Sequence, residues 1–174
     1  MKSSKPSPNS LALAGEFATL SQLALRGYDA NLTLGNTKNV DILVSDPGSG
    51  SMYRLEVKTT GYRSATGSAG KRSSLFGYNF EWMMSKKHED VIDPSLFYCF
   101  VNIAGEEGTS FRFFIVPSRV VAKYVKAQHQ LWLDQDPNHK DTSMRVFRLA
   151  LEKVGYPLPT PSAERYENNW SFRR

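Results

Sequence analysis

The sequence predicts an α/β protein in which helices flank a mixed β-sheet of about five strands. Three observations support this fold class. A helical pattern opens the chain, three short segments rich in β-branched and aliphatic residues follow it, and an amphipathic helical segment comes after two further strand-like segments. The 174 residues suffice for one domain, and 40% apolar with 22% charged residues is ordinary globular composition.

The first helix is expected over about residues 11–26. Ser10 or Asn9 can cap it, and Gly27 stands just past its last turn, where a C-cap glycine belongs. Its core-facing side is predicted from apolar side chains that recur at helical spacing. These are Leu13, Phe17, Leu20 and Ala24.

Five strands are expected beyond this helix. The segments YDANLTL, NVDILVSD and MYRLEVKTT are the first three, and the turn PGSGS predicts that the last two of these form a hairpin. SLFYCFVNIAG and SFRFFIVPS are the other two, joined by the turn EEGT, and Ser118 then opens an amphipathic helix. LFGYNFEWMMSKKHEDVID is ambiguous and partly helical in character, and MRVFRLALEKV fits a strand or a helix.

The domain boundaries follow from composition. Residues 1–9 are rich in Ser, Pro, Lys and Asn and are expected to form a flexible tail, which leaves residues 10–174 as a single domain. Within it, the Gly/Ser-rich residues 61–74 are interpreted as a mobile basic loop. Residues 134–174 are interpreted as a C-terminal extension that packs on the core.

Composition excludes several function classes. A single cysteine, Cys99, allows no disulfide framework and no CxxC metal site, which suits a reducing cytoplasm. No apolar run is long enough to cross a membrane, and no glycine-rich phosphate loop implies a nucleotide cofactor. The net charge of +5 and pI near 9.3 agree with a polyanionic partner, although many proteins with no such partner have a similar excess.

Two acids and a lysine are expected to meet on one face of the sheet. In the third strand Glu56 and Lys58 share a face, opposite Leu55 and Val57. If the hairpin pairs the strands antiparallel, Asp41 sits across from Glu56. Two adjacent carboxylates stay ionised together only with a cation between them, and oxygen ligands suit Mg²⁺. The alternative is a structural salt bridge on an exposed sheet face.

These residues resemble the motif of the PD-(D/E)xK, or restriction-endonuclease-like, nuclease superfamily. The matching pieces are GE in the first helix, VDILV in the second strand and LEVKTT in the third, with Val40 where the family often has proline. The chain is most similar to the small single-domain group of homing endonucleases and Holliday-junction-resolvase-like proteins. The resemblance implies a restriction-endonuclease-like core with αβββαβ element order and additions.

The resemblance also implies an activity and its residues. Asp41 and Glu56 are expected to bind Mg²⁺ together with the main-chain carbonyl of Val57, and Mn²⁺ is expected to substitute. Lys58 is expected to position or activate the attacking water, and Glu16 to complete the metal shell, unless it is simply a solvated helix residue. The implied reaction is endonucleolytic hydrolysis of DNA phosphodiester bonds by metal-activated water. Because each chain has one site, a homodimer or higher homo-oligomer is expected.

Basic residues near this constellation are the expected DNA contacts. A loop that follows the catalytic strand can fold over a phosphate backbone, although a solvated loop with incidental charge explains the same residues. Two alternatives to the enzyme stay open: a catalytically inactive nucleic-acid-binding module, and a defence or regulatory module of the same fold that binds a protein. The residues expected to contact nucleic acid are Tyr62, Arg63, Lys71, Arg72, Lys86 and Lys87.

Overall fold

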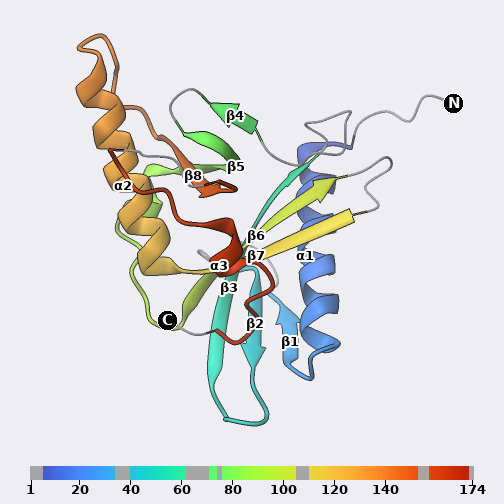
Figure 1. The fold of residues 1–174 in the computed structure, drawn as a ribbon. Coiled ribbons are helices and arrows are strands. Elements are labelled where there is room, and N and C mark those ends of the chain that lie inside the picture. The colour runs from blue at the N-terminus through green and yellow to red at the C-terminus, as the bar shows by residue number, and fades with distance from the viewer. Residues whose placement is uncertain are drawn as a thin grey trace, which may run out of the picture.

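A five-stranded mixed sheet forms the centre of the molecule (Figure 1). The structure is a computed structural model that describes residues 6–33, 40–61, 71–73, 76–104, 110–152 and 157–172. The strand order is β1-β2-β3-β6-β7; the β3–β6 pair is parallel and the other three pairs are antiparallel. The predicted fold class is therefore confirmed. The strands are β1 Asp29–Leu32, β2 Ile42–Ser45, β3 Met52–Gly61, β6 Leu96–Ala104 and β7 Ser110–Pro117.

A smaller antiparallel sheet of order β4-β5-β8 packs beside the central one. Both segments with ambiguous patterns form strands in it, since GYNFEWMMS is β5 and MRVFRLA is β8. Between β3 and β6 the described residues hold β4, β5 and the short 3-10 helix η1, and α2 comes only after β7. Part of the predicted loop is thus strand β4. The bounds are β4 Lys71–Ser73, β5 Gly77–Ser85, η1 Lys86–Glu89, α2 Ser118–Gln135, β8 Met144–Ala150 and α3 Ala163–Tyr166.

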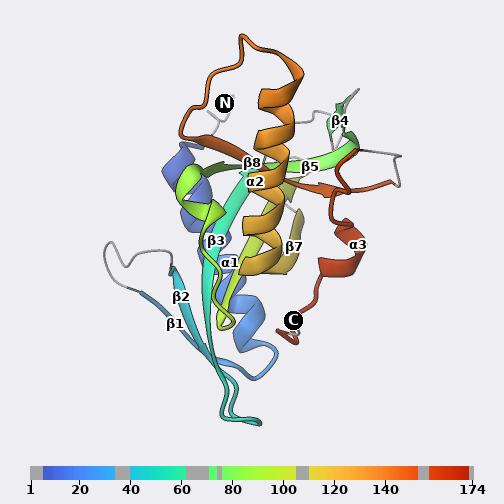
Figure 2. The same cartoon turned by 90° about the vertical axis from the view of Figure 1, so that its left-hand side faces the viewer.

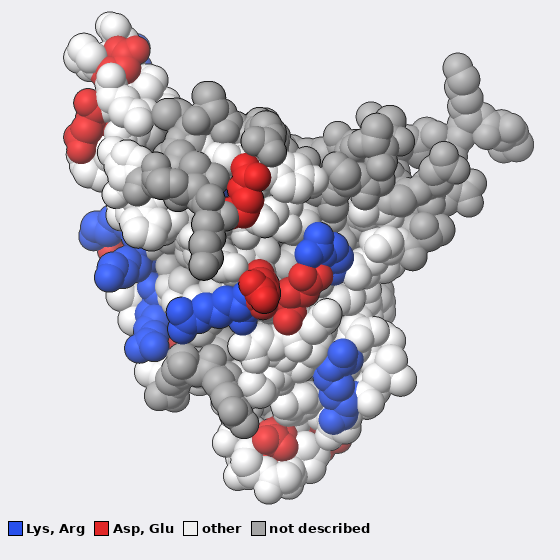
Figure 3. All heavy atoms as spheres, viewed as in Figure 1, with Lys and Arg blue, Asp and Glu red and all other residues white. Residues whose placement is uncertain are grey.

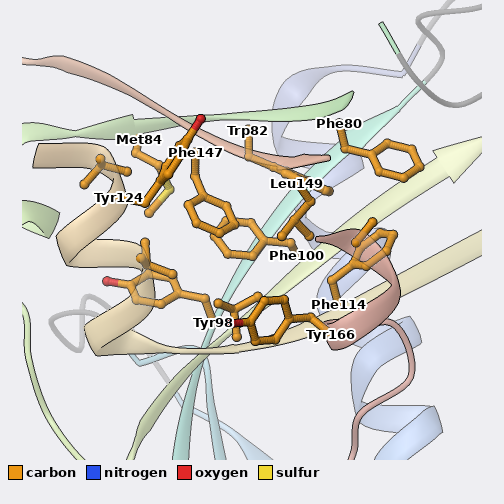
Figure 4. Close-up of a cluster of buried hydrophobic side chains, with 14 of the residues drawn as sticks. Phe80, Trp82, Met84, Tyr98, Phe100, Phe114, Tyr124, Phe147, Leu149 and Tyr166 are labelled. Atoms are coloured by element: carbon orange, nitrogen blue, oxygen red, sulfur yellow. The ribbon is translucent and has the colours of Figure 1, made fainter. Parts of the chain in front are cut away.

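Two hydrophobic clusters cover the two faces of the central sheet. The larger lies between β6 and β7 on one side and β5, β8 and α2 on the other, and it is rich in stacked aromatic rings (Figure 4). The second lies under helix α1, Pro8–Ala24, and includes Trp170 and Phe172 from the chain's C-terminal segment. Each face of β3 therefore meets a different core, and side chains that alternate along β3 enter different environments.

Helix α1 begins three residues earlier than about residue 11. Pro8 occupies the first turn, where its missing N–H costs no hydrogen bond, and Ser7 caps the helix by accepting from the Ser10 amide at 3.1 Å. Residues 8 and 9 therefore belong to the helix rather than to the predicted tail, and residues 1–5 lie outside the described part of the chain. Gly27 has the left-handed backbone expected of it, with φ +79°.

The predicted core-facing side of α1 is wrong at three of its four positions. Leu13 and Phe17 are about half exposed and Ala24 is exposed, whereas Leu20 packs partly buried against the second cluster. The fully buried positions are Gly15, Thr19 and Leu23. The reason is close packing on β3: a Cβ added at Gly15 would lie 1.9 Å from Thr59 Oγ1. The face of the helix that approaches the sheet is therefore chosen by small size rather than by apolar bulk.

The turn between β2 and β3 forms as predicted and sets the strand register. Asp46 accepts from the Gly48 amide at 2.9 Å and the Ser49 hydroxyl at 2.7 Å, and Gly50 supplies the positive φ of 70°. Ile42 then pairs with Leu55. None of the helices in the described ranges is long and apolar enough to cross a membrane.

Candidate active site

Asp41 and Glu56 meet where strand β2 begins, opposite the middle of β3. The hairpin register that pairs Ile42 with Leu55 places Asp41 across from Glu56. The Asp41 amide donates to the Leu55 carbonyl at 2.7 Å, and the Asp41 carboxylate accepts from the Val57 amide at 2.6 Å. Both the backbone and the side chain of Asp41 are therefore hydrogen-bonded to β3. This juxtaposition is the one that strand alternation and the turn predict.

Glu56 is a buried carboxylate with one oxygen left without a partner. Its residue is 3% exposed, and its Oε1 lies 2.5 Å from Lys58 Nζ. Oε2 is buried and has no hydrogen-bond partner in the described structure. Because a buried charge that is incompletely paired carries a desolvation penalty of several kcal/mol, this oxygen is poised to accept a cationic or donor ligand.

The acids around Glu56 hold their protons more tightly than usual. Burial raises the pKa of Asp41, opposed by the Val57 amide and Lys58, while nearby Glu56 adds to the increase. Burial also raises the pKa of Glu16, followed by the charge of Asp41, and Lys58 lowers it. Glu16 therefore lies close enough to Asp41 and Lys58 to feel their charges, as expected. It is half-buried and flanks Gly15 on the helix face that touches β3.

The carbonyl of Val57 lies on the strand edge that faces Asp41. Arg54 donates its amide to Ser95 before β6, and Leu55 accepts from Asp41 on the opposite edge. Backbone groups of an extended strand alternate between edges, so the Val57 amide and carbonyl both point to the Asp41 side. The amide binds Asp41 there. This carbonyl can therefore reach the same space as the two carboxylates.

Two buried residues that the sequence analysis did not select complete the cluster. His88, on η1, is 2% exposed, and its Nε2 lies 3.7 Å from Glu56 Oε1. Its Nδ1 lies 2.9 Å from the hydroxyl of Tyr98, which is fully buried on β6. Burial, with Lys58 and Lys87 nearby, lowers the pKa of His88 to about 4, so its ring is neutral near pH 7.

The donor set fits a hard divalent cation. Asp41 and Glu56 supply carboxylate oxygens, the unpartnered Glu56 Oε2 is an acceptor without a donor, and Val57 adds a carbonyl. Across the described ranges, no three His, Cys, Asp or Glu side chains form one metal-binding group. A bound ion would therefore need further ligands from the main chain, water or substrate, an arrangement that Mg²⁺ tolerates because it keeps several waters.

The predicted DNA contacts divide into three groups. Lys87 is exposed beside the site, where it lowers the pKa of both Asp41 and His88. Lys86 is instead bound to Asp141 at 2.6 Å, so the structure assigns it to a different cluster. The others cannot be placed as contacts: Tyr62 and Arg63 lie outside the described residues, as do the side chains of Lys71 and Arg72.

A basic stripe on α2 was not selected as a DNA contact. Arg119, Lys123 and Lys126 are exposed at helical spacing, and Figure 3 shows basic side chains gathered beside α2. Element η1, which carries Lys87 and His88, packs against α2, the helix that faces the viewer in Figure 2, and so links this stripe to the site. The helical spacing of these three bases is the sequence signal that could have identified them as a basic surface.

A cavity of about 290 Å³ adjoins Lys58, and none of its lining residues comes from β2. Its walls come from the start of α1, the end of β3 and the middle of β5, and they include Leu11, Thr60 and Trp82. The space gives a bound molecule access to the lysine from solvent.

Comparison with known proteins identifies a fold relative. No family model matches the chain, and no curated protein matches it. Among solved structures it is similar to the bacterial homing endonuclease I-Ssp6803I, with a TM-score of 0.50 and 13% sequence identity. The similarity covers 95% of this chain and 92% of that chain. At this identity the likeness establishes a shared fold.

Proposed function

We propose that the chain is a Mg²⁺-dependent endonuclease of the PD-(D/E)xK type that hydrolyses DNA phosphodiester bonds. The observation that carries the proposal is the pair Asp41 and Glu56, which neighbouring strands bring together beside Lys58 with Glu56 Oε2 unpartnered. A shared fold with a homing endonuclease supports the same reading. Because a fold alone hosts many functions, the proposal depends on the site.

The residues have separate tasks in this reaction. Asp41, Glu56 and the Val57 carbonyl would hold the ion, whose chemistry is to neutralise the charge that develops on the phosphate oxygens. Lys58 is 28% exposed in its side chain and can hold a water or a phosphate oxygen from the cavity side. Glu16 approaches from α1 and adds negative charge that favours a cation. Mn²⁺, which also accepts oxygen ligands, is expected to replace Mg²⁺.

DNA is the proposed substrate because the acidic site needs a basic surface around it. Carboxylates repel phosphate, so binding energy has to come from nearby Lys and Arg. Lys87 and the α2 stripe of Arg119, Lys123 and Lys126 provide such a surface in the described structure. We also propose a homo-oligomer, since two strands need two sites, and half-exposed Leu13 and Phe17 offer apolar area for contact.

A catalytically inactive DNA-binding module is the second candidate. Lys58 Nζ already lies 2.5 Å from Glu56 Oε1, and this closed ion pair can serve structure alone. Such a module would bind DNA with strong salt dependence through the α2 stripe and cut nothing. The two candidates therefore differ in metal dependence.

Plasmid nicking with matched aspartate variants tests the proposal. Supercoiled plasmid should be nicked or linearised with Mg²⁺ and remain intact with EDTA. Asp41→Asn should lower the rate by on the order of 10²-fold or more, because it removes a charged oxygen at the ion. Asp46→Asn is the matched control: it makes the same change at an exposed turn and keeps a side-chain acceptor for that turn.

The outcomes separate the candidates. Equal nicking by Asp41→Asn and Asp46→Asn would contradict the proposed site. DNA binding without cleavage under Mg²⁺ or Mn²⁺ would favour the inactive module.

A further inference from the structure

Glu56 lies in a buried polar cluster built from three elements. Glu56 on β3, Tyr98 on β6 and His88 on η1 are 3%, 0% and 2% exposed. His88 Nδ1 lies 2.9 Å from the Tyr98 hydroxyl, and His88 Nε2 lies 3.7 Å from Glu56 Oε1. Most buried polar groups in a core are hydrogen-bonded, and the close contact of His88 with Tyr98 shows that these residues are arranged around one another.

The parallel pairing of β3 and β6 places Tyr98 beside the acid. Glu56 and Tyr98 are register partners, so their side chains leave neighbouring strands on the same face of the sheet. Burial first, and then the charge of Glu56 and a hydrogen bond to its carboxylate, raise the pKa of Tyr98, so the hydroxyl lies next to the acid. Its ring stacks on Phe100, with centroids 5.8 Å apart, which fixes its direction.

His88 approaches the same carboxylate at Oε1. It belongs to η1, which packs against α2, and its ring meets Tyr98 edge-on with centroids 5.6 Å apart. Lys58 holds Oε1 on the site side. Lys58 and His88 both adjoin Oε1, and Tyr98 lies beside Glu56 in the sheet, so the three groups restrain the carboxylate while Oε2 has no hydrogen-bond partner.

We propose that Tyr98 and His88 are positioning residues, which hold the Glu56 carboxylate so that Oε2 faces the space shared with Asp41. This inference rests on the proposed function and adds residues to it. Side chains behind a ligating carboxylate set its orientation, and their loss typically weakens metal binding by 10–100-fold. Neither residue touches substrate, and both act through Glu56.

Tyr124 provides a matched control in the same aromatic cluster. It is 4% exposed, and its hydroxyl lies 3.4 Å from Thr160 Oγ1, away from Glu56. Figure 4 shows the hydroxyls of Tyr98 and Tyr124 at different edges of the cluster. Tyr98→Phe and Tyr124→Phe therefore remove the same atom from the same core, and they differ in whether that atom adjoins Glu56.

Mn²⁺ binding to these variants, measured by calorimetry or spin resonance, tests the inference. Tyr98→Phe should weaken Mn²⁺ binding by about 10–100-fold and raise the Mg²⁺ concentration needed for half-maximal nicking more than it lowers the maximal rate. Tyr124→Phe should leave both unchanged. His88→Leu should also weaken Mn²⁺ binding. Tyr98→Phe combined with His88→Leu should lose less binding free energy than the two single variants together, because both residues act on one carboxylate. Wild-type affinity in Tyr98→Phe would overturn the inference.

A measurement without metal separates this inference from the proposed function. Urea midpoints should be measured for Glu56→Gln, for Tyr98→Phe and for the variant that carries both changes. The shifts of the two single variants should not add up to that of the combined variant if the hydroxyl restrains the carboxylate. Additive midpoints would overturn the positioning role. A wild-type protein that neither binds Mn²⁺ nor cuts DNA would instead overturn the proposed function, and the urea cycle would still decide whether Tyr98 restrains Glu56.

Discussion

Two charged clusters each include residues of η1 and differ in how completely their groups are paired. At one, Glu56 is buried with one oxygen unpartnered. At the other, Arg145 is buried at 2% exposure and donates to Glu89, to Asp141 and to the carbonyls of Thr142 and Met144. Both contain an acid, a base and a histidine, so composition does not distinguish them.

The difference shows which cluster is structural. Every described contact of Arg145 satisfies a donor, and Asp141 also holds Lys86 at 2.6 Å and His129 at 3.0 Å. These donors lower the pKa of Asp141 and keep it ionised. In the Glu56 cluster, burial instead raises the pKa of Asp41. The acceptor Oε2 of Glu56 has no hydrogen-bond partner there. A stable fold needs the first arrangement, whereas the second gains from a ligand.

The largest expected effect breaks the paired cluster. Arg145→Met should lower the free energy of unfolding by about 3–5 kcal/mol, because it leaves the Glu89 carboxylate, whose side chain is only 11% exposed, without its cation. Lys86→Met, which removes an exposed partner of the same cluster, should cost about 1 kcal/mol or less. Urea titration checks both. A loss below about 1 kcal/mol for Arg145→Met would show that this cluster is not the structural one.

A smaller effect follows from acidification. The pKa of His88 falls from 6.5 to about 4 on folding, so the unfolded chain binds its proton first as pH drops through that window. Stability should decline between about pH 6.5 and 4 by up to about 1.4 kcal/mol per pH unit from this group. The raised pKa values of Asp41 and Glu16 act with the opposite sign near their own titration.

The comparison of wild type with His88→Gln isolates this term. The difference between their free energies of unfolding should change across that window and level off above about pH 6.5. Asp141 should change the free energy of unfolding only below about pH 4. Folding lowers its pKa, so the stability that it contributes is lost as pH falls below the pKa of the unfolded acid. A pH-independent difference would contradict a neutral, buried His88.

Much of the acidic pair could be predicted from the sequence. Alternation places Glu56 and Lys58 on one face, and the Asp46 turn sets the register that brings Asp41 opposite Glu56. These are local rules that act within one hairpin. Strand β5 also carried its signal, since Phe80, Trp82 and Met84 alternate and are buried on one face.

The remaining parts depend on contacts between distant segments. Tyr98 lies beside Glu56 because β6 pairs in parallel with β3, and His88 reaches both residues from η1; no local pattern specifies these contacts. The orientation of α1 was mispredicted in part, because Leu13 and Phe17 point outward while Gly15 meets Thr59. Steric fit at a crossing point outweighs hydrophobic periodicity there, and a sequence pattern does not record such a fit.

Calorimetric titration of Mn²⁺ into wild type and Glu56→Gln tests the central claim most directly. The claim is that Glu56 and Asp41 leave their site incompletely satisfied until a divalent cation binds. Wild type should bind one ion per chain, and Glu56→Gln should lose that binding while staying folded, because it removes only charge. Equal binding by the two proteins, or none by wild type, would contradict the account.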